Sequence, residues 1–311
     1  MPLPKVLENR LSVPVIGSPM FILSQPELVI AQCKAGVVGS FPVLNARQPG
    51  QLEVWLKRLR AELTDADAPF ACNLIVHKST PRLEEDLALL VKYQVPLVIC
   101  SLGARTDVYE AVHSYGGFVF HDIINDMFAH KAIEKGADGI VAVAAGAGGH
   151  AGTLSPFALV QEIRAWFNGP VALSGAIANG GAVLAAQACS ADLAYIGSAF
   201  IATEEAVAVP DYKQMVVESH ADDIVYTNLF TGVHGNYLKP SIRNAGLDPD
   251  HLPESDASKM SFADLNTGSK AWKDIWGCGQ GIGAVDAVVP AAAVVARLRQ
   301  EYAAARARLA L

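Results

Sequence analysis

Short apolar segments recur along this 311-residue chain, and segments of helical length separate them. Each has the length and composition of a strand that is buried on both faces. Eight of them lie at 13–18, 37–41, 70–76, 96–101, 117–122, 139–144, 171–175 and 194–198. Eight strands with helices between them predict an α/β protein, a (β/α)8 TIM barrel. A doubly wound open sheet is the alternative, and it would need fewer strands.

Helix signals stand between these segments. Ser24 is placed to cap a helix over 25–35 that has Pro26 in its first turn, and Thr80 is placed to cap a helix over 81–93. Pro156 marks another helix start directly after Ser155. The barrel therefore has candidates for its outer ring of helices.

The regular alternation stops after the eighth segment. Residues 204–275 contain several prolines and mixed polar stretches, and an Ala/Val-rich helix then follows within 286–307. We predict that residues 1–203 and 276–311 form the barrel. Residues 204–275 would form an inserted small domain or lid over the barrel mouth.

Composition limits the classes of partner. The formal net charge is −7, from 24 basic and 31 acidic residues, and no Lys/Arg stripe is present. Nucleic acid and anionic membranes are therefore poor partner hypotheses. The N-terminus lacks a signal-peptide h-region, so we expect a cytoplasmic protein, with a homodimer left open. The five scattered cysteines predict reduced, buried thiols, and no spacing predicts a metal site.

The most distinctive stretch is the glycine-rich segment 144–153, which follows the sixth predicted strand. Gly146, Gly148 and Ala151 fit a dinucleotide-binding pattern, but so do Gly279, Gly281 and Ala284 further along the chain. In a barrel this segment lies at the C-terminal end of a strand, where active sites are found. His150 is its one side chain that can move a proton near neutral pH, so we predict that it is catalytic. A structural histidine bonded to backbone is the alternative.

The seventh and eighth predicted strands end in small residues that leave backbone N–H groups accessible. Ser174, Gly175 and Ala176 follow the seventh strand, and Gly197 and Ser198 follow the eighth. Loops at these two positions form the recurring phosphate site of TIM barrels. The alternative is that Ser-Gly-Ala is only a tight turn.

Other polar residues follow strands or lie in the insertion. Ser101 ends the fourth strand, and His121 and Asp122 end the fifth, where they would contact a cofactor or cap the next helix. The run 231–239 mixes polar, aromatic and glycine positions, and from it we assign His234 and Tyr237, with Ser101, to the substrate pocket.

Together, Ser18-Pro19-Met20, the Ala147–Gly152 loop, the turn at 174–177 and the run 197–203 resemble the nitronate monooxygenase family, formerly called 2-nitropropane dioxygenases. The resemblance covers the whole chain and implies an FMN-dependent β/α barrel with a small inserted domain. It implies oxidation of alkyl nitronates or nitroalkanes by O2 to a carbonyl compound and nitrite, with His150 facing the substrate above the flavin. The implied FMN contacts are Pro19, Met20, Asn73, His121, Gly149, Ser174, Gly175, Ala176, Gly197 and Ser198.

Two other functions remain open on the same scaffold. The chain also resembles flavin-dependent reductases of enoyl and quinone substrates, which use NAD(P)H and share the barrel and the FMN site. A barrel that binds a phosphorylated metabolite without redox chemistry is the third hypothesis.

Overall fold

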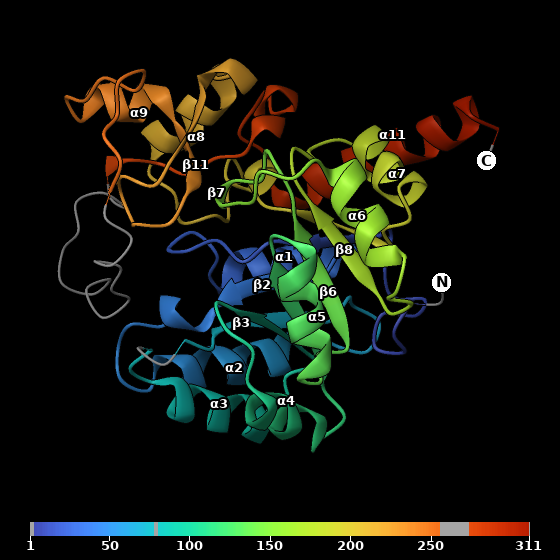
Figure 1. The fold of residues 1–311 in the computed structure, drawn as a ribbon. Coiled ribbons are helices and arrows are strands. Elements are labelled where there is room, and N and C mark those ends of the chain that lie inside the picture. Colours follow the sequence, from blue (N-terminus) through green and yellow to red (C-terminus); the bar gives the residue numbers. More distant parts are fainter. Residues whose placement is uncertain (1–2, 78–79, 256–273, 311) are drawn as a thin grey trace.

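The computed structural model describes residues 3–77, 80–255 and 274–310 (Figure 1). Its main sheet has eight parallel strands in the order β1-β9-β8-β6-β5-β4-β3-β2. These strands are β1 Val15–Gly17, β2 Gly39–Pro42, β3 Phe70–Ile75, β4 Leu97–Ser101, β5 Phe118–Ile123, β6 Gly139–Val143, β8 Val171–Ser174 and β9 Leu193–Ile196. Each falls on one of the eight apolar segments, so the predicted strands are confirmed.

The sheet closes on itself between its two end strands. Ile16 of β1 bridges Val38 in parallel, directly before β2. The N–H of Gly17 donates to the carbonyl of Val38 at 2.7 Å, and the N–H of Val38 donates to the carbonyl of Val15 at 3.1 Å. The fold is therefore the predicted TIM barrel, and the open-sheet alternative is wrong.

Helices surround the barrel. They are α1 Pro26–Ala35, α2 Gln51–Glu62, α3 Leu83–Lys92, α4 Thr106–His113, α5 Asp126–Glu134, α6 Pro156–Arg164, α7 Gly180–Ala188 and α11 Ala291–Arg308. The last one, α11, packs against both α7 and α1 and so fills the eighth place of the ring. Two predicted caps are wrong: the Ser24 hydroxyl accepts from the N–H of Met20, and α3 begins only after Arg82, beyond Thr80.

Side chains alternate across each barrel strand, which fixes what faces the interior. Ala71, Ile99 and Phe120 belong to the cluster that fills the barrel. Two residues further along the same three strands, on the same face, stand Asn73, Ser101 and Asp122. The apolar interior thus ends in a polar layer at the C-terminal mouth.

The chain after β9 joins the barrel through a second, antiparallel sheet. This part of the chain includes the helices α8 Pro210–Glu218 and α9 Lys239–Asn244 and the strands β10 Ile224–Thr227 and β11 Gly235–Leu238. Strand β11 pairs with β10 on one side and, on the other, with β7 Gly149–His150, which lies within the loop after β6 (Figure 1). The division at 204–275 stays a prediction, and residues 256–273 lie outside the described residues. No helix among the described residues is long and apolar enough to cross a membrane.

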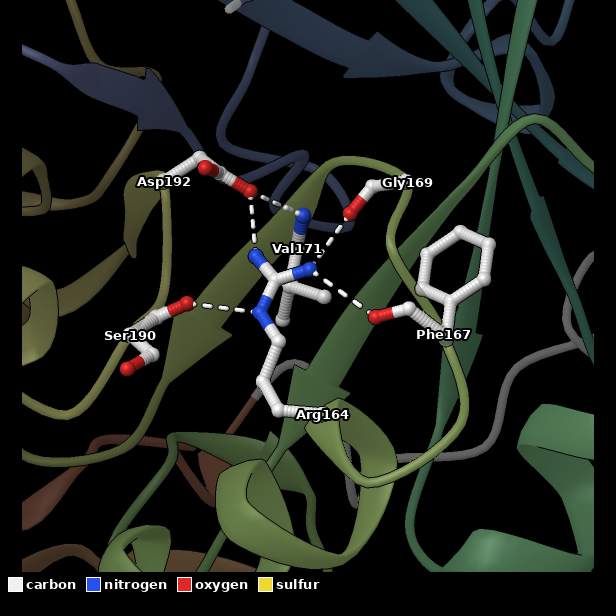
Figure 2. A network of polar contacts seen from close by, with 6 residues as sticks. All are labelled: Arg164, Phe167, Gly169, Val171, Ser190 and Asp192. Carbon is white, nitrogen blue, oxygen red and sulfur yellow. Dashed lines mark hydrogen bonds and ion pairs between the residues drawn. The ribbon is translucent and has the colours of Figure 1, made fainter. Parts of the chain in front are cut away.

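At the opposite end of the barrel, Arg164 joins α6 to the starts of β8 and β9 (Figure 2). Its guanidinium donates to the carbonyls of Phe167, Gly169 and Ser190 and pairs with Asp192. The same Asp192 carboxylate accepts from the N–H of Val171 at 2.8 Å. One mostly buried cation therefore satisfies several backbone groups where two strands begin.

Replacing Arg164 by Lys should lower the free energy of unfolding by about 2–4 kcal/mol, because an ammonium cannot satisfy this planar set of acceptors. Chemical denaturation measures the change, and Arg58→Lys on the exposed face of α2 is the matched control, with an expected loss below about 1 kcal/mol. Equal losses in the two variants would contradict a special role of the Arg164 network.

Candidate active site

A cavity of about 1110 Å³ opens at the C-terminal ends of the barrel strands. This is at the upper limit of pockets that enclose one drug-sized ligand, so a cofactor and a substrate fit together. Its walls come from strand ends, from the loop after β6 and from the chain after β9. Of the predicted site residues, it is lined by Pro19, Met20, Asn73, Ser101, His121, Gly149, His150, Ser174, Gly197 and Ser198.

A small cleft of about 20 Å³ adjoins this cavity and shares Ser174, Gly197 and Ser198 with it. Gly175 and Ala176 line the cleft as well, so all five residues of the predicted phosphate site come together. Within the described part of the chain, the N–H groups of Gly175 and Gly197 have no protein acceptor. Two such N–H donors at one cleft suit the anionic oxygens of a group such as a phosphate.

The segment 277–281 completes this cleft, and its role could not be recognised from the sequence pattern alone. The N–H of Gly279 donates to the Ser198 hydroxyl at 2.8 Å, and the N–H of Gln280 donates to the carbonyl of Gly146 at 2.9 Å. A Cβ on Gly279 would lie 2.7 Å from that same carbonyl oxygen. The second glycine pattern therefore packs onto the first, and the close approach requires glycine at position 279.

His150 lies in β7, paired with Gly235 of β11, and lines the large cavity. Its Nε2 is 3.0 Å from the Thr231 hydroxyl, which itself donates to the carbonyl of Val233. Since that hydroxyl has one hydrogen, Nε2 of His150 is the donor, and Nδ1 is the nitrogen that can accept a proton. Burial lowers the pKa of His150 to about 4, so the imidazole is neutral at pH 7.

The chain after β9 fixes the backbone around His150. The Asn236 amide donates to the carbonyl of Ala147 at 2.7 Å, and a Cβ on Gly235 would lie 2.7 Å from the carbonyl oxygen of Gly149. Val233 lines the cavity and Thr231 orients His150, so the run 231–239 reaches the site through these two residues. The assigned substrate residues His234 and Tyr237 do not line the cavity: His234 stacks on Tyr226, and Tyr237 is buried beside Ile242.

The polar layer of the barrel forms a hydrogen-bonded chain along one wall of the cavity. The Asn73 amide donates to the Ser101 hydroxyl at 2.7 Å, and that hydroxyl donates to the carboxylate of Asp122. Burial raises the pKa of Asp122 to about 6, against which the hydrogen bond from Ser101 acts. In the sequence, the alternation of side chains along a strand is the pattern that could have indicated that Ser101 and Asp122 lie on the same face of the sheet.

His121 lies on the opposite face of β5 from Asp122. Its Nδ1 is 2.8 Å from the hydroxyl of Tyr109 on α4, and burial lowers its pKa to about 4. It still contributes to the cavity wall. A neutral imidazole fixed by a tyrosine is suited to positioning and packing.

Comparison with known proteins agrees with this geometry. The model of the nitronate monooxygenase family matches residues 79–301. A nitronate monooxygenase of Paraburkholderia phytofirmans is 26% identical, over 93% of this chain and 92% of its own. The structure of FabK from Thermotoga maritima is 25% identical with a TM-score of 0.80, covering 98% of this chain and 96% of its own. A nitroalkane oxidase structure from Streptomyces ansochromogenes shares the fold at 24% identity and a TM-score of 0.84, covering 98% of this chain and all (100%) of its own.

The Asp122→Asn variant should show how much the buried carboxylate lowers the free energy of unfolding. A raised pKa means that the native state binds the proton more tightly than the unfolded chain does. Wild-type stability from this group is therefore present below pH 3.8 and lost as the pH rises to about 6. Relative to the wild type, the variant should gain up to about 3 kcal/mol over this interval and nothing further above pH 7. Denaturation at several pH values measures the difference, and a pH-independent difference would contradict the assignment.

Proposed function

The chain belongs to the nitronate monooxygenase family and is an oxidoreductase, and we propose that it uses FMN to oxidise alkyl nitronates with O2 to a carbonyl compound and nitrite. The observation that supports this most is that the small cleft and the large cavity adjoin each other. A glycine-lined cleft beside the free N–H groups of Gly175 and Gly197 adjoins a cavity that also holds a neutral histidine. FMN has a phosphate, a linker and a flat ring system, which suits this combination.

The residues of the cleft would hold the FMN phosphate. Gly175 and Gly197 would donate their N–H groups, and Ser198 would contribute its main chain while its hydroxyl holds Gly279 in place. The ring system would then lie in the cavity against Pro19, Met20 and the polar layer with Asn73. When bound, FMN supplies the redox chemistry, and the protein contributes position and electrostatics.

His150 would act on the substrate. Its neutral imidazole can accept the acidic α-proton of a nitroalkane at Nδ1, while Thr231 keeps the other nitrogen protonated. A nitronate has already lost that proton, so its oxidation needs no base at Nδ1, and the one N–H of the neutral imidazole is directed at Thr231. Comparing a neutral nitroalkane with its nitronate therefore tests His150 as a base.

The direct test is anaerobic mixing of the FMN-loaded protein with ethylnitronate or propionate 3-nitronate. Loss of the flavin absorbance, followed by nitrite release in air, is the expected result. Bleaching by NADH or NADPH without any reaction with nitronates would instead support the enoyl or quinone reductase. Protein that stays colourless after incubation with FMN would support the non-redox phosphate-binding barrel.

We expect His150→Asn to reduce kcat/KM for neutral nitroethane by about 100-fold or more, because general-base catalysis contributes this much. Activity on preformed ethylnitronate should fall much less. Thr231→Val should cause a smaller loss, of about tenfold, confined mostly to nitroethane. It leaves the imidazole ring in place but removes the hydroxyl that keeps the proton on Nε2. Steady-state oxygen consumption measures both substrates. Unchanged turnover in His150→Asn would support the structural-histidine alternative.

Gly279→Ala should abolish or strongly weaken FMN binding, because the added Cβ would collide with Gly146 and displace the loop that closes the cleft. Gly181→Ala is the matched control, since a Cβ there would contact only the Asn179 side chain at 3.4 Å. Fluorescence titration of the apoprotein with FMN measures both affinities. Retention of wild-type affinity by Gly279→Ala would place the phosphate elsewhere.

A further inference from the structure

The large cavity has a side that the glycine cleft and His150 do not use. The cleft belongs to β8 and β9 and His150 to the loop after β6, whereas β3 and β4 lie across the barrel in the strand order. On that far side, beyond Asn73 and Ser101 of the polar layer, the lining includes the apolar Ile75 and Leu102 together with His77. The mouth continues this surface, because Ile124 and Phe128 line the cavity while about two fifths of each (42% and 41%) is exposed.

Two cations border the mouth, one on each flank of β3 and β4 in the strand order. Arg47 follows β2, Lys131 lies on α5, and both are exposed and line the cavity. Neither has an acidic partner within the described residues, although many other arginines and lysines form ion pairs. Among the described lining residues the one acidic group is Asp122, which belongs to the interior layer.

The positions of these cations relate them to the apolar wall. Lys131 follows Phe128 by three residues in α5, so the two share a helix face and the lysine stem leans toward the helix N-terminus. The Arg47 guanidinium lies 5.5 Å from the ring centroid of Phe21, which also lines the cavity. Each cation therefore stands at the edge of an apolar surface, where it can keep its charge in water.

We propose that the substrate is an elongated amphipathic anion. Its reacting carbon would lie beside His150, its apolar chain against the β2–β5 side of the cavity, and its carboxylate or phosphate at Arg47 and Lys131. Small nitronates would fill only the inner part. This inference rests on the proposed function for the reacting group, but the chemistry of the ligand can be tested without turnover.

The binding test uses calorimetry of the purified protein with decanoate, butanoate and 1-decanol. Decanoate should bind at least about tenfold more tightly than butanoate, because burial of each added methylene is favourable. It should also bind more tightly than the uncharged decanol. Arg47→Gln and Lys131→Gln should each weaken decanoate by about three- to fivefold and leave decanol unchanged. Lys135→Gln, at the end of α5 and outside the cavity lining, is the matched control and should have no effect.

Equal affinities for decanoate and butanoate would overturn the proposal, as would an equal loss in Lys135→Gln. Decyl phosphate and decanoate separate the two sources of the anion: whichever binds more tightly identifies the end group, and either order supports the proposal. The nitronate of 10-nitrodecanoate should also exceed ethylnitronate in kcat/KM. If no nitronate reacts while decanoate still requires Arg47 and Lys131, the proposed function fails and the ligand class stands.

Discussion

Closure of the parallel sheet is the constraint on which the rest of this structure depends. Once Ile16 pairs with Val38, all eight barrel strands end at one mouth, and residues distant in the sequence become neighbours. Alternation along each strand then decides which side chains face inward. The interior is apolar up to the layer that contains Phe120. It becomes polar two residues further along the strands, at Asn73, Ser101 and Asp122.

A second pairing makes the mouth into a site. Strand β11 pairs with Gly149 and His150, so this part of the loop after β6 is held against the chain that follows β9. The same part of the chain supplies Thr231, which sets the tautomer of His150, and 277–281, which closes the cleft. The residues after β9 are therefore part of the candidate active site, and their removal would leave the barrel without an oriented histidine.

Burial gives the ionisable groups of the cavity unusual charge states. His150 and His121 are neutral at pH 7 because their pKa values are lowered, while Asp122 ionises only near pH 6. At pH 7 the Asp122 carboxylate is therefore the acidic charge of the described lining, and the positive groups lie at the rim, at Arg47 and Lys131. Such a distribution suits a ligand with an apolar body and one anionic end.

The sequence by itself determined the barrel, because eight apolar segments separated by helix-length spacers permit few other folds. It also predicted that residues 174–176 and 197–198 lie together at the mouth, and they line one cleft there, since position within a barrel assigns these loops their place. Tertiary structure alone decided the contacts between distant segments: Gly279 onto Gly146, Thr231 onto His150, and the absence of His234 and Tyr237 from the cavity wall. No local pattern encodes these pairings, because they depend on how the chain after β9 returns to the mouth. Asp122 lies between the two cases: the sequence left it open as a cofactor contact or a helix cap, and the structure showed that it faces the barrel interior and accepts from Ser101.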